Sequence, residues 1–308
     1  MADGAPMAGM AGLGPAIVPL LTEIGDLKRV VAAHFDASFA TGRFLTAWGR
    51  LAAGEALDDV AYPMLAEAVA CARLGALDAE RLGALGLDEA ARRGVFDRAL
   101  DEFEGMVAPA LADRLRAAMP LHAPAEAPPA PAFAHALARQ PRAGVTCPGR
   151  ARVMLQPEEN HAEHSYAVAV YAGLLAPDFG ADPATAFWYG MVHHLHSAAM
   201  PDAGFTGEVL LGDRLGEVID EARRQALAEL PDEIAARACD VFPAIDADGT
   251  PEARAFHAAD VIDRVLEIQY HTRANGLTMD QVLGEYELVH DGPVKAFHDR
   301  VLAAVSLP

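Results

Sequence analysis

Apolar residues recur every three to four positions in the first third of the chain, and this spacing predicts amphipathic helices. Further apolar stripes of the same period lie within residues 44–51 and 95–111. The clearest stripe comprises Ile17, Leu20, Leu21, Ile24, Leu27 and Val31. Strand signals are absent from the pattern. We therefore expect an all-α fold.

Two helix starts are marked in the second half of the chain. Asp182 followed by Pro183 is typical of an N-cap and a first helical position, and it predicts a helix that continues to about His196. Thr250 followed by Pro251 repeats the pattern and predicts a second, long helix. The second half is therefore also predicted to be helical.

Composition divides the chain into four parts. Residues 1–15 are rich in Gly, Ala and Met and are predicted to be disordered. Residues 16–121 pair no ionisable groups in a way that suggests chemistry, so they are predicted to form a helical accessory domain. Residues 122–133 hold a Pro/Ala tract that predicts a semi-rigid linker. Residues 134–308 form the predicted second domain, where most of the histidines lie.

Charge and composition restrict the partners. Apolar residues make up 52% of the chain but aromatic residues only 6%, a balance that suits packed helices better than a sheet. The formal net charge of −20 repels nucleic-acid phosphates and anionic lipid, so we expect neither nucleic acid nor membrane as a partner. A small anionic substrate stays compatible, because a bound metal ion can reverse the local potential.

The cysteines and the start of the chain favour a cytoplasmic protein. Cys71, Cys147 and Cys239 are scattered without the CxxC spacing of a thiolate zinc site, which is typical of a reducing compartment. The first 21 residues lack the basic start of a signal peptide, and no apolar run is long enough to span a membrane. The sequence leaves the oligomeric state open, including a homo-oligomer.

Candidate metal ligands gather in three short clusters of the second half. In each cluster two potential ligands lie three residues apart, so they share one face of a helix. A single His on an apolar helix is more often a hydrogen-bonded core residue, but three clusters in one domain favour a metal site. Imidazole and carboxylate ligands suit Mn, Co, Zn, Ni or Fe. The clusters are His161 with His164, His193 and His194 with His196, and His257 with Asp260.

Four segments of the second half follow one another in a fixed order: residues 158–165, EENHAEHS; residues 191–194, MVHH; residues 208–213, EVLLGD; and residues 258–261, AADV. In this order they resemble the motifs of HD-domain phosphohydrolases, and they are most similar to the bacterial 5′-deoxynucleotidase branch. The first segment resembles the opening motif, and the third resembles a later one. Residues 191–194, MVHH, stand where the family has a His-Asp pair, so His194 replaces the Asp. Asp260 stands at the position of the final Asp ligand. The resemblance covers roughly residues 142–275.

The resemblance implies an HD-like helical bundle and a metal centre. His164, His193 and Asp260 match metal ligands of the family. The fourth ligand is either His194, at the matching position, or His196, which would share a helical face with His193. We prefer His194, which gives a mononuclear centre with three histidines and one aspartate.

The resemblance also implies catalytic residues and a substrate class. Glu208 would be the general acid/base that orients the attacking water, and Asp213 would help to position water or substrate. A phosphate would meet a basic residue before the first motif, either Arg150 or Arg152. About eleven extra residues, 195–206, are predicted to form a loop over the site. The implied function is a metal-dependent phosphohydrolase for a nucleotide or another small phosphate ester.

Two other functions stay open on the sequence alone. An HD-type iron oxygenase would use additional ligands, and His161, His196 and His257 are candidates for them. Those enzymes, however, use the bridging carboxylate that His194 replaces here. A non-catalytic metal-binding regulatory protein is the third reading, although the retained Glu208 argues against the loss of catalysis.

Overall fold

The computed structural model describes residues 13–33, 36–122, 128–275 and 278–308. The predicted disordered N-terminus and much of the predicted linker therefore fall outside the described residues. Before the linker the helices are η1 (Pro15–Ile17), α1 (Val18–Asp26), α2 (Phe39–Ala52), α3 (Leu57–Leu74), α4 (Ala79–Ala84), α5 (Glu89–Asp101) and α6 (Pro109–Ala118).

The rest of the described chain is also helical, and the prediction of an all-α fold is confirmed. Two isolated β-bridges, Pro141 with Asn160 and Val145 with Val153, are the only strand-like pairings in the described ranges. The helices are α7 (Ala132–Arg139), α8 (His161–Phe179), α9 (Pro183–Val192), η2 (Leu195–Ala198), α10 (Gly204–Leu211), η3 (Gly212–Arg214), α11 (Leu215–Leu227), α12 (Asp232–Ile245), α13 (Pro251–Asn275), η4 (Gln281–Glu285) and α14 (Lys295–Ala304).

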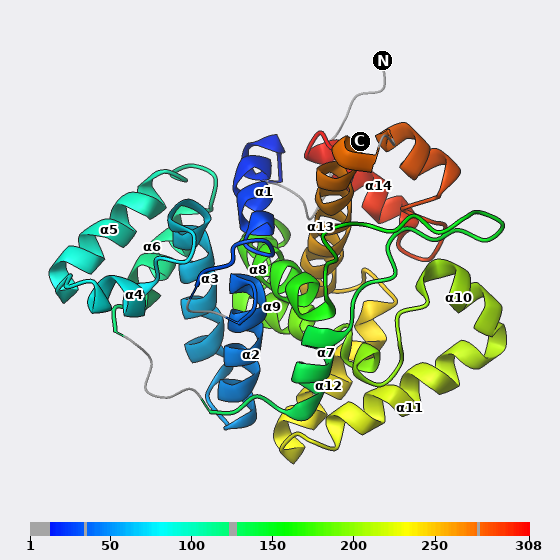
Figure 1. Cartoon of the computed structure of the whole chain (residues 1–308), viewed down its shortest axis with the longest axis horizontal. Coiled ribbons are helices and arrows are strands. Elements are labelled where there is room, and N and C mark those ends of the chain that lie inside the picture. Colours follow the sequence, from blue (N-terminus) through cyan, green and yellow to red (C-terminus); the bar gives the residue numbers. More distant parts are fainter. Residues whose placement is uncertain (1–12, 34–35, 123–127, 276–277) are drawn as a thin grey trace.

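Helix α8 is the centre of the molecule (Figure 1). It starts at a capping box in which the Asn160 side chain accepts from the Glu163 backbone and the Glu163 side chain accepts from the Asn160 backbone. Nearly all of its residues are buried, because α9, α13, α2, α3 and α7 pack around it. A helix covered on every side can carry polar groups only where they meet partners, so its two histidines are positioned by the core.

Both predicted helix starts are confirmed. The Asp182 side chain accepts from the backbone of Thr185 at 2.8 Å, and α9 begins at Pro183. The Thr250 hydroxyl accepts from the backbone of Ala253 at 3.1 Å at the start of α13. These caps fix where two helices begin: α9, which precedes the second cluster, and α13, which carries the third.

The predicted end of the first of these helices is wrong. Helix α9 ends at Val192, and the chain continues through a turn into the short 3-10 helix η2. His194 leaves the α-helical conformation, with φ −106° and ψ 21°, and its ring lies near those of His161 and His164. His193 and His196 therefore do not share one face of a continuous α-helix.

Glycine lets α9 approach α8 closely. A Cβ atom added to Gly190 would lie 2.3 Å from the Cα of Ala169 on α8, which is closer than packed atoms can come. The two helices thus touch through backbone at this point. The contact places His193, three residues later, beside the first turns of α8.

The hydrophobic core runs continuously from Ile17 to Val305. Helices α1, α2 and α3 pack directly on α8, and the Trp48 ring of α2 lies 5.5 Å from the Trp188 ring of α9, centre to centre. Apolar contacts therefore cross the predicted boundary at residues 122–133, while the division into two domains stays a prediction. No helix in the described ranges is both long and apolar enough to cross a membrane.

Candidate metal centre

Three segments bring the predicted metal ligands together. Helix α8 contributes His164, the turn after α9 contributes His193, and α13 contributes Asp260. The Nε2 atom of His164 lies 3.2 Å from Nε2 of His193 and 3.3 Å from Oδ1 of Asp260. All three residues are buried, with at most 9% of their surface exposed.

Hydrogen bonds fix which nitrogen of each ring carries a proton. The Nδ1 atom of His164 lies 2.8 Å from Oδ2 of Asp263, and Nδ1 of His193 lies 2.7 Å from the carbonyl oxygen of Gly190. A carboxylate and a carbonyl only accept, so both Nδ1 atoms donate and both Nε2 atoms carry lone pairs. These lone pairs converge with Oδ1 of Asp260, which is buried and has no hydrogen-bond partner in the described chain. Such an arrangement is repulsive unless a cation lies between the three atoms.

His194 completes the group. Its ring centre lies 4.2 Å from that of His193 and 5.1 Å from that of His164. The three imidazoles each offer a ligand atom, and these atoms lie within 4.8 Å of one another. The Nδ1 atom of His194 is buried and has no partner among the described residues. The four preferred ligands of the sequence thus lie together in space.

Electrostatics keeps the donors deprotonated. Burial lowers the pKa of His164 to about 4 and the pKa of His193 to about 3, so both rings are neutral near pH 7. Burial alone would raise the pKa of Asp260, but Arg264, whose Nη2 lies 3.0 Å from Oδ2, holds that pKa well below its ordinary value. Metal ligands must be in these protonation states.

The donor set therefore fits a divalent transition metal. Neutral imidazoles with one carboxylate suit Mn, Co, Zn, Ni or Fe. The Asp263 carboxylate and the Gly190 carbonyl hold the far nitrogens of His164 and His193, as is usual for metal-binding histidines.

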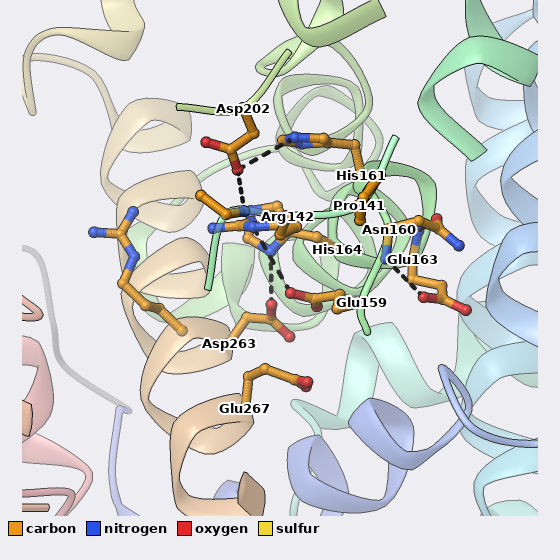
Figure 2. A network of polar contacts seen from close by, with 12 residues as sticks. Pro141, Arg142, Glu159, Asn160, His161, Glu163, His164, Asp202, Asp263 and Glu267 are labelled. Atoms are coloured by element: carbon orange, nitrogen blue, oxygen red, sulfur yellow. Dashed lines mark hydrogen bonds and ion pairs between the residues drawn. The ribbon is translucent and has the colours of Figure 1, made fainter. Parts of the chain in front are cut away.

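Two of the three additional candidate ligands border this centre. The ring of His161 lies 4.7 Å from that of His194, and its Nε2 lies 3.5 Å from Oδ2 of Asp202, as Figure 2 shows. The ring of His196 lies 5.4 Å from that of His194, and its Nδ1 is buried without a partner in the described chain. Both are adjacent to the centre rather than within the group of converging donors.

His257 is directed elsewhere. Its Nε2 donates to the carbonyl oxygen of Ala247 at 3.1 Å, and its ring lies 5.6 Å from that of His298. It is part of the helix α13 that carries Asp260, but it belongs to a separate group of contacts.

A cavity of about 150 Å³ opens over the centre. His164 and His194 line it, together with Asp202 and Gly204 from the segment predicted to cover the site. Glu208 of α10 also lines the cavity, and partial burial and the nearby Asp202 carboxylate raise its pKa.

The structure places other predicted residues away from this cavity. Asp213 is exposed in η3 and is not among the lining residues. Arg150 is exposed and pairs with Glu285 at 3.3 Å, and Arg152 is exposed as well. The roles of these three residues stay predictions. Two other arginines, Arg142 and Arg264, line the cavity instead.

Two residues of this region, Asp263 and Arg142, were not predicted from the sequence. Asp263 holds His164, and its spacing of three residues from Asp260 on one helix face is a signal that could have found it. Arg142 stands before the opening motif in an irregular segment, where no local pattern indicates which arginine turns inward.

The comparisons place the chain in a family. A family model described as HD domain matches residues 134–292, just over half of the chain. Comparison with curated proteins and with solved structures finds no match. Members of the HD-domain superfamily generally bind divalent metals and include metal-dependent phosphohydrolases, and the chain's histidine cluster could hold such an ion. The chain belongs to the HD-domain family.

Proposed function

We propose that the protein is a metal-dependent phosphohydrolase that acts on a nucleotide or another small phosphate ester. The observation that carries the proposal is the convergence of His164, His193 and Asp260 lone pairs at a cavity that also presents Glu208 and two arginines. A divalent ion held there would polarise a phosphate ester and lower the pKa of water.

The arginines supply the positive charge that a phosphate requires. The Nη1 atom of Arg142 is buried and has no hydrogen-bond partner in the described chain, so it can donate to an anion in the cavity. Arg264 holds Asp260 through one Nη atom and faces the same cavity. A phosphate between these two side chains would lie over the metal ligands.

Glu208 is placed to move a proton. Partial burial and the nearby Asp202 carboxylate raise its pKa above the ordinary value, which is the direction that suits a general acid/base. The Glu208 side chain lines the same cavity as His164 and His194.

Two features favour a small ester over a polyanion. Glu158 and Glu287 also line the cavity, and their charges oppose additional phosphates. Phe205 and His290 also line the cavity, and their rings stack on each other with centres 4.2 Å apart and an angle of 14° between the planes. Aromatic lining of this kind supports a substrate with a base, such as a nucleoside monophosphate.

Metal content and phosphate release test the proposal together. The purified chain is loaded in turn with Mn, Co, Zn, Ni or Fe and assayed for phosphate release from p-nitrophenyl phosphate and from nucleoside monophosphates. We expect turnover with at least one metal. Two irons per chain with oxygen uptake would instead show an oxygenase, and bound metal without any turnover would show a regulatory protein.

A further inference from the structure

Lys28, which follows α1, is buried near the metal centre. Only 5% of its surface is exposed, and it lies more than a hundred positions before the matched residues 134–292. Its ammonium group contacts three carboxylates, with Nζ 2.6 Å from Glu159, 2.6 Å from Asp263 and 3.4 Å from Glu267. An ammonium group has three N–H donors, so each carboxylate can receive one.

One of these carboxylates connects Lys28 to a metal ligand. Oδ1 of Asp263 accepts from Nζ of Lys28 at 2.6 Å, and Oδ2 accepts from Nδ1 of His164 at 2.8 Å. Figure 2 shows Asp263 and Glu159 next to each other below the His164 ring. A continuous line of hydrogen bonds thus runs from the N-terminal half to Nδ1 of His164.

We propose that Lys28 is a positioning residue of the metal centre, which orients His164 through Asp263. By holding Oδ1, Lys28 leaves Oδ2 to accept the Nδ1 proton of His164, and this directs the Nε2 lone pair toward His193 and Asp260. The inference rests on the proposed metal centre and adds a residue from outside the family match to it.

Charge accounts for the dependence of Asp263 on Lys28. Among the described residues, Glu267 forms a second ion pair with Arg29, and Glu159 forms a second one with Arg142 at 3.8 Å. Lys28 is the only Lys or Arg in an ion pair with Asp263 there. Without it, a fully buried carboxylate would face two others and would have to rearrange.

If Lys28 only stabilised the fold, its loss would lower the melting temperature and leave the metal affinity unchanged. Metal binding is therefore the main readout. Lys28→Met, Lys28→Arg and the control Arg29→Met are compared with the full wild-type chain by calorimetric titration with Zn²⁺ and by the absorption spectrum of bound Co²⁺. Arg29 is a matched control because it contacts Glu267 and stacks on Tyr270, and it has no contact with Asp263.

We expect Lys28→Met to weaken Zn²⁺ binding about 10- to 100-fold, as loss of a group that orients a ligand does. Lys28→Arg should lose less, because it keeps a cation beside Asp263, and Arg29→Met should bind as the wild type does. Wild-type affinity in Lys28→Met would overturn the inference, even if its melting temperature fell.

Two further measurements keep the outcomes distinct. If Lys28→Met does not fold, Asp263→Asn is titrated in its place, and wild-type affinity in that variant would refute the connection through Asp263. If the wild-type chain itself binds no metal, the proposed function fails rather than the role of Lys28. Nitrogen chemical shifts of His164 in the metal-free wild type and in Lys28→Met then test the role directly, since the inference requires that loss of Lys28 changes the protonation of Nδ1.

Discussion

At the scale of single residues, the candidate centre depends on hydrogen bonds that leave the Nε2 atoms of His164 and His193 unprotonated. Each ring donates from Nδ1 to an oxygen, one on Asp263 and one on the backbone of Gly190. Cation binding therefore needs no rotation of either ring. The same reasoning separates His257, whose Nε2 is used by a backbone carbonyl, from the group.

The proposed acid/base role of Glu208 predicts a specific loss of catalysis. Glu208→Gln should lower kcat for p-nitrophenyl phosphate about 10²- to 10⁴-fold, because the amide cannot exchange the proton. KM and metal content should stay at wild-type values, since Glu208 is not a metal ligand. The control is Glu217→Gln on α11, an exposed glutamate that pairs with Arg214 away from the cavity. Equal kcat for Glu208→Gln and the wild type would contradict the role.

A histidine outside the metal centre predicts how stability depends on pH. Burial lowers the pKa of His298 on α14 to about 4, against an ordinary value of 6.5 in the unfolded chain. Between these pH values the unfolded chain binds the proton more tightly than the folded chain does. The free energy of unfolding is therefore highest above about pH 6.5 and falls as the pH drops toward 4. His298→Leu should remove this dependence.

The expected difference can be measured by urea denaturation in the presence of EDTA, which keeps bound metal from contributing. Relative to the wild type, the free energy of unfolding of His298→Leu should rise by roughly 2 kcal/mol between about pH 8 and about pH 5. The comparison at pH 8, where His298 is neutral in both states, is the internal control. Parallel pH profiles for the two proteins would show that His298 is not the cause.

At the scale of elements, the sequence predicts where helices begin better than where they end. Asp182 and Thr250 mark their caps locally, because each side-chain oxygen accepts from an N–H group three residues later. The end of α9 at Val192 has no such signal, because it depends on how the turn at His194 packs against α8. The sequence therefore indicates the candidate ligands as a set, while the geometry of the second cluster could not be predicted.

The close approach of α9 to α8 predicts a large effect from one methyl group. Gly190→Ala places a Cβ 2.3 Å from the backbone of Ala169, so α9 must move and His193 with it. We expect a loss of about 1–3 kcal/mol in the free energy of unfolding and weaker Zn²⁺ binding. Gly216→Ala on α11 is the matched control, because its added Cβ meets nothing within 4 Å and should raise stability by up to about 1 kcal/mol. Similar effects of the two substitutions would refute the packing argument.

At the scale of the whole molecule, the first half of the chain shares one core with the second half, and its Lys28 forms an ion pair with Asp263 beside the candidate metal centre. It was predicted to carry no chemistry, because its ionisable residues have no local pairing. Lys28 and Asp263 are 235 positions apart, and a contact at that separation leaves no periodic signal in one sequence. Trp48 likewise packs on Trp188 across the predicted boundary. Contacts of this kind, between residues in opposite halves of the chain, could not be predicted from local patterns.

Removing the first half tests this dependence. A chain of residues 129–308 keeps every candidate metal ligand but exposes the faces of α8 and α9 that α1, α2 and α3 cover. Burial of such apolar surface contributes roughly 25 cal/mol per Å², so the truncated chain should lose cooperative thermal unfolding and Zn²⁺ binding. Co-expression with residues 1–128 should restore both, because the contacts between the halves need no covalent link. A truncated chain that unfolds cooperatively and binds Zn²⁺ as the full chain does would support an independent second domain and deny Lys28 its role.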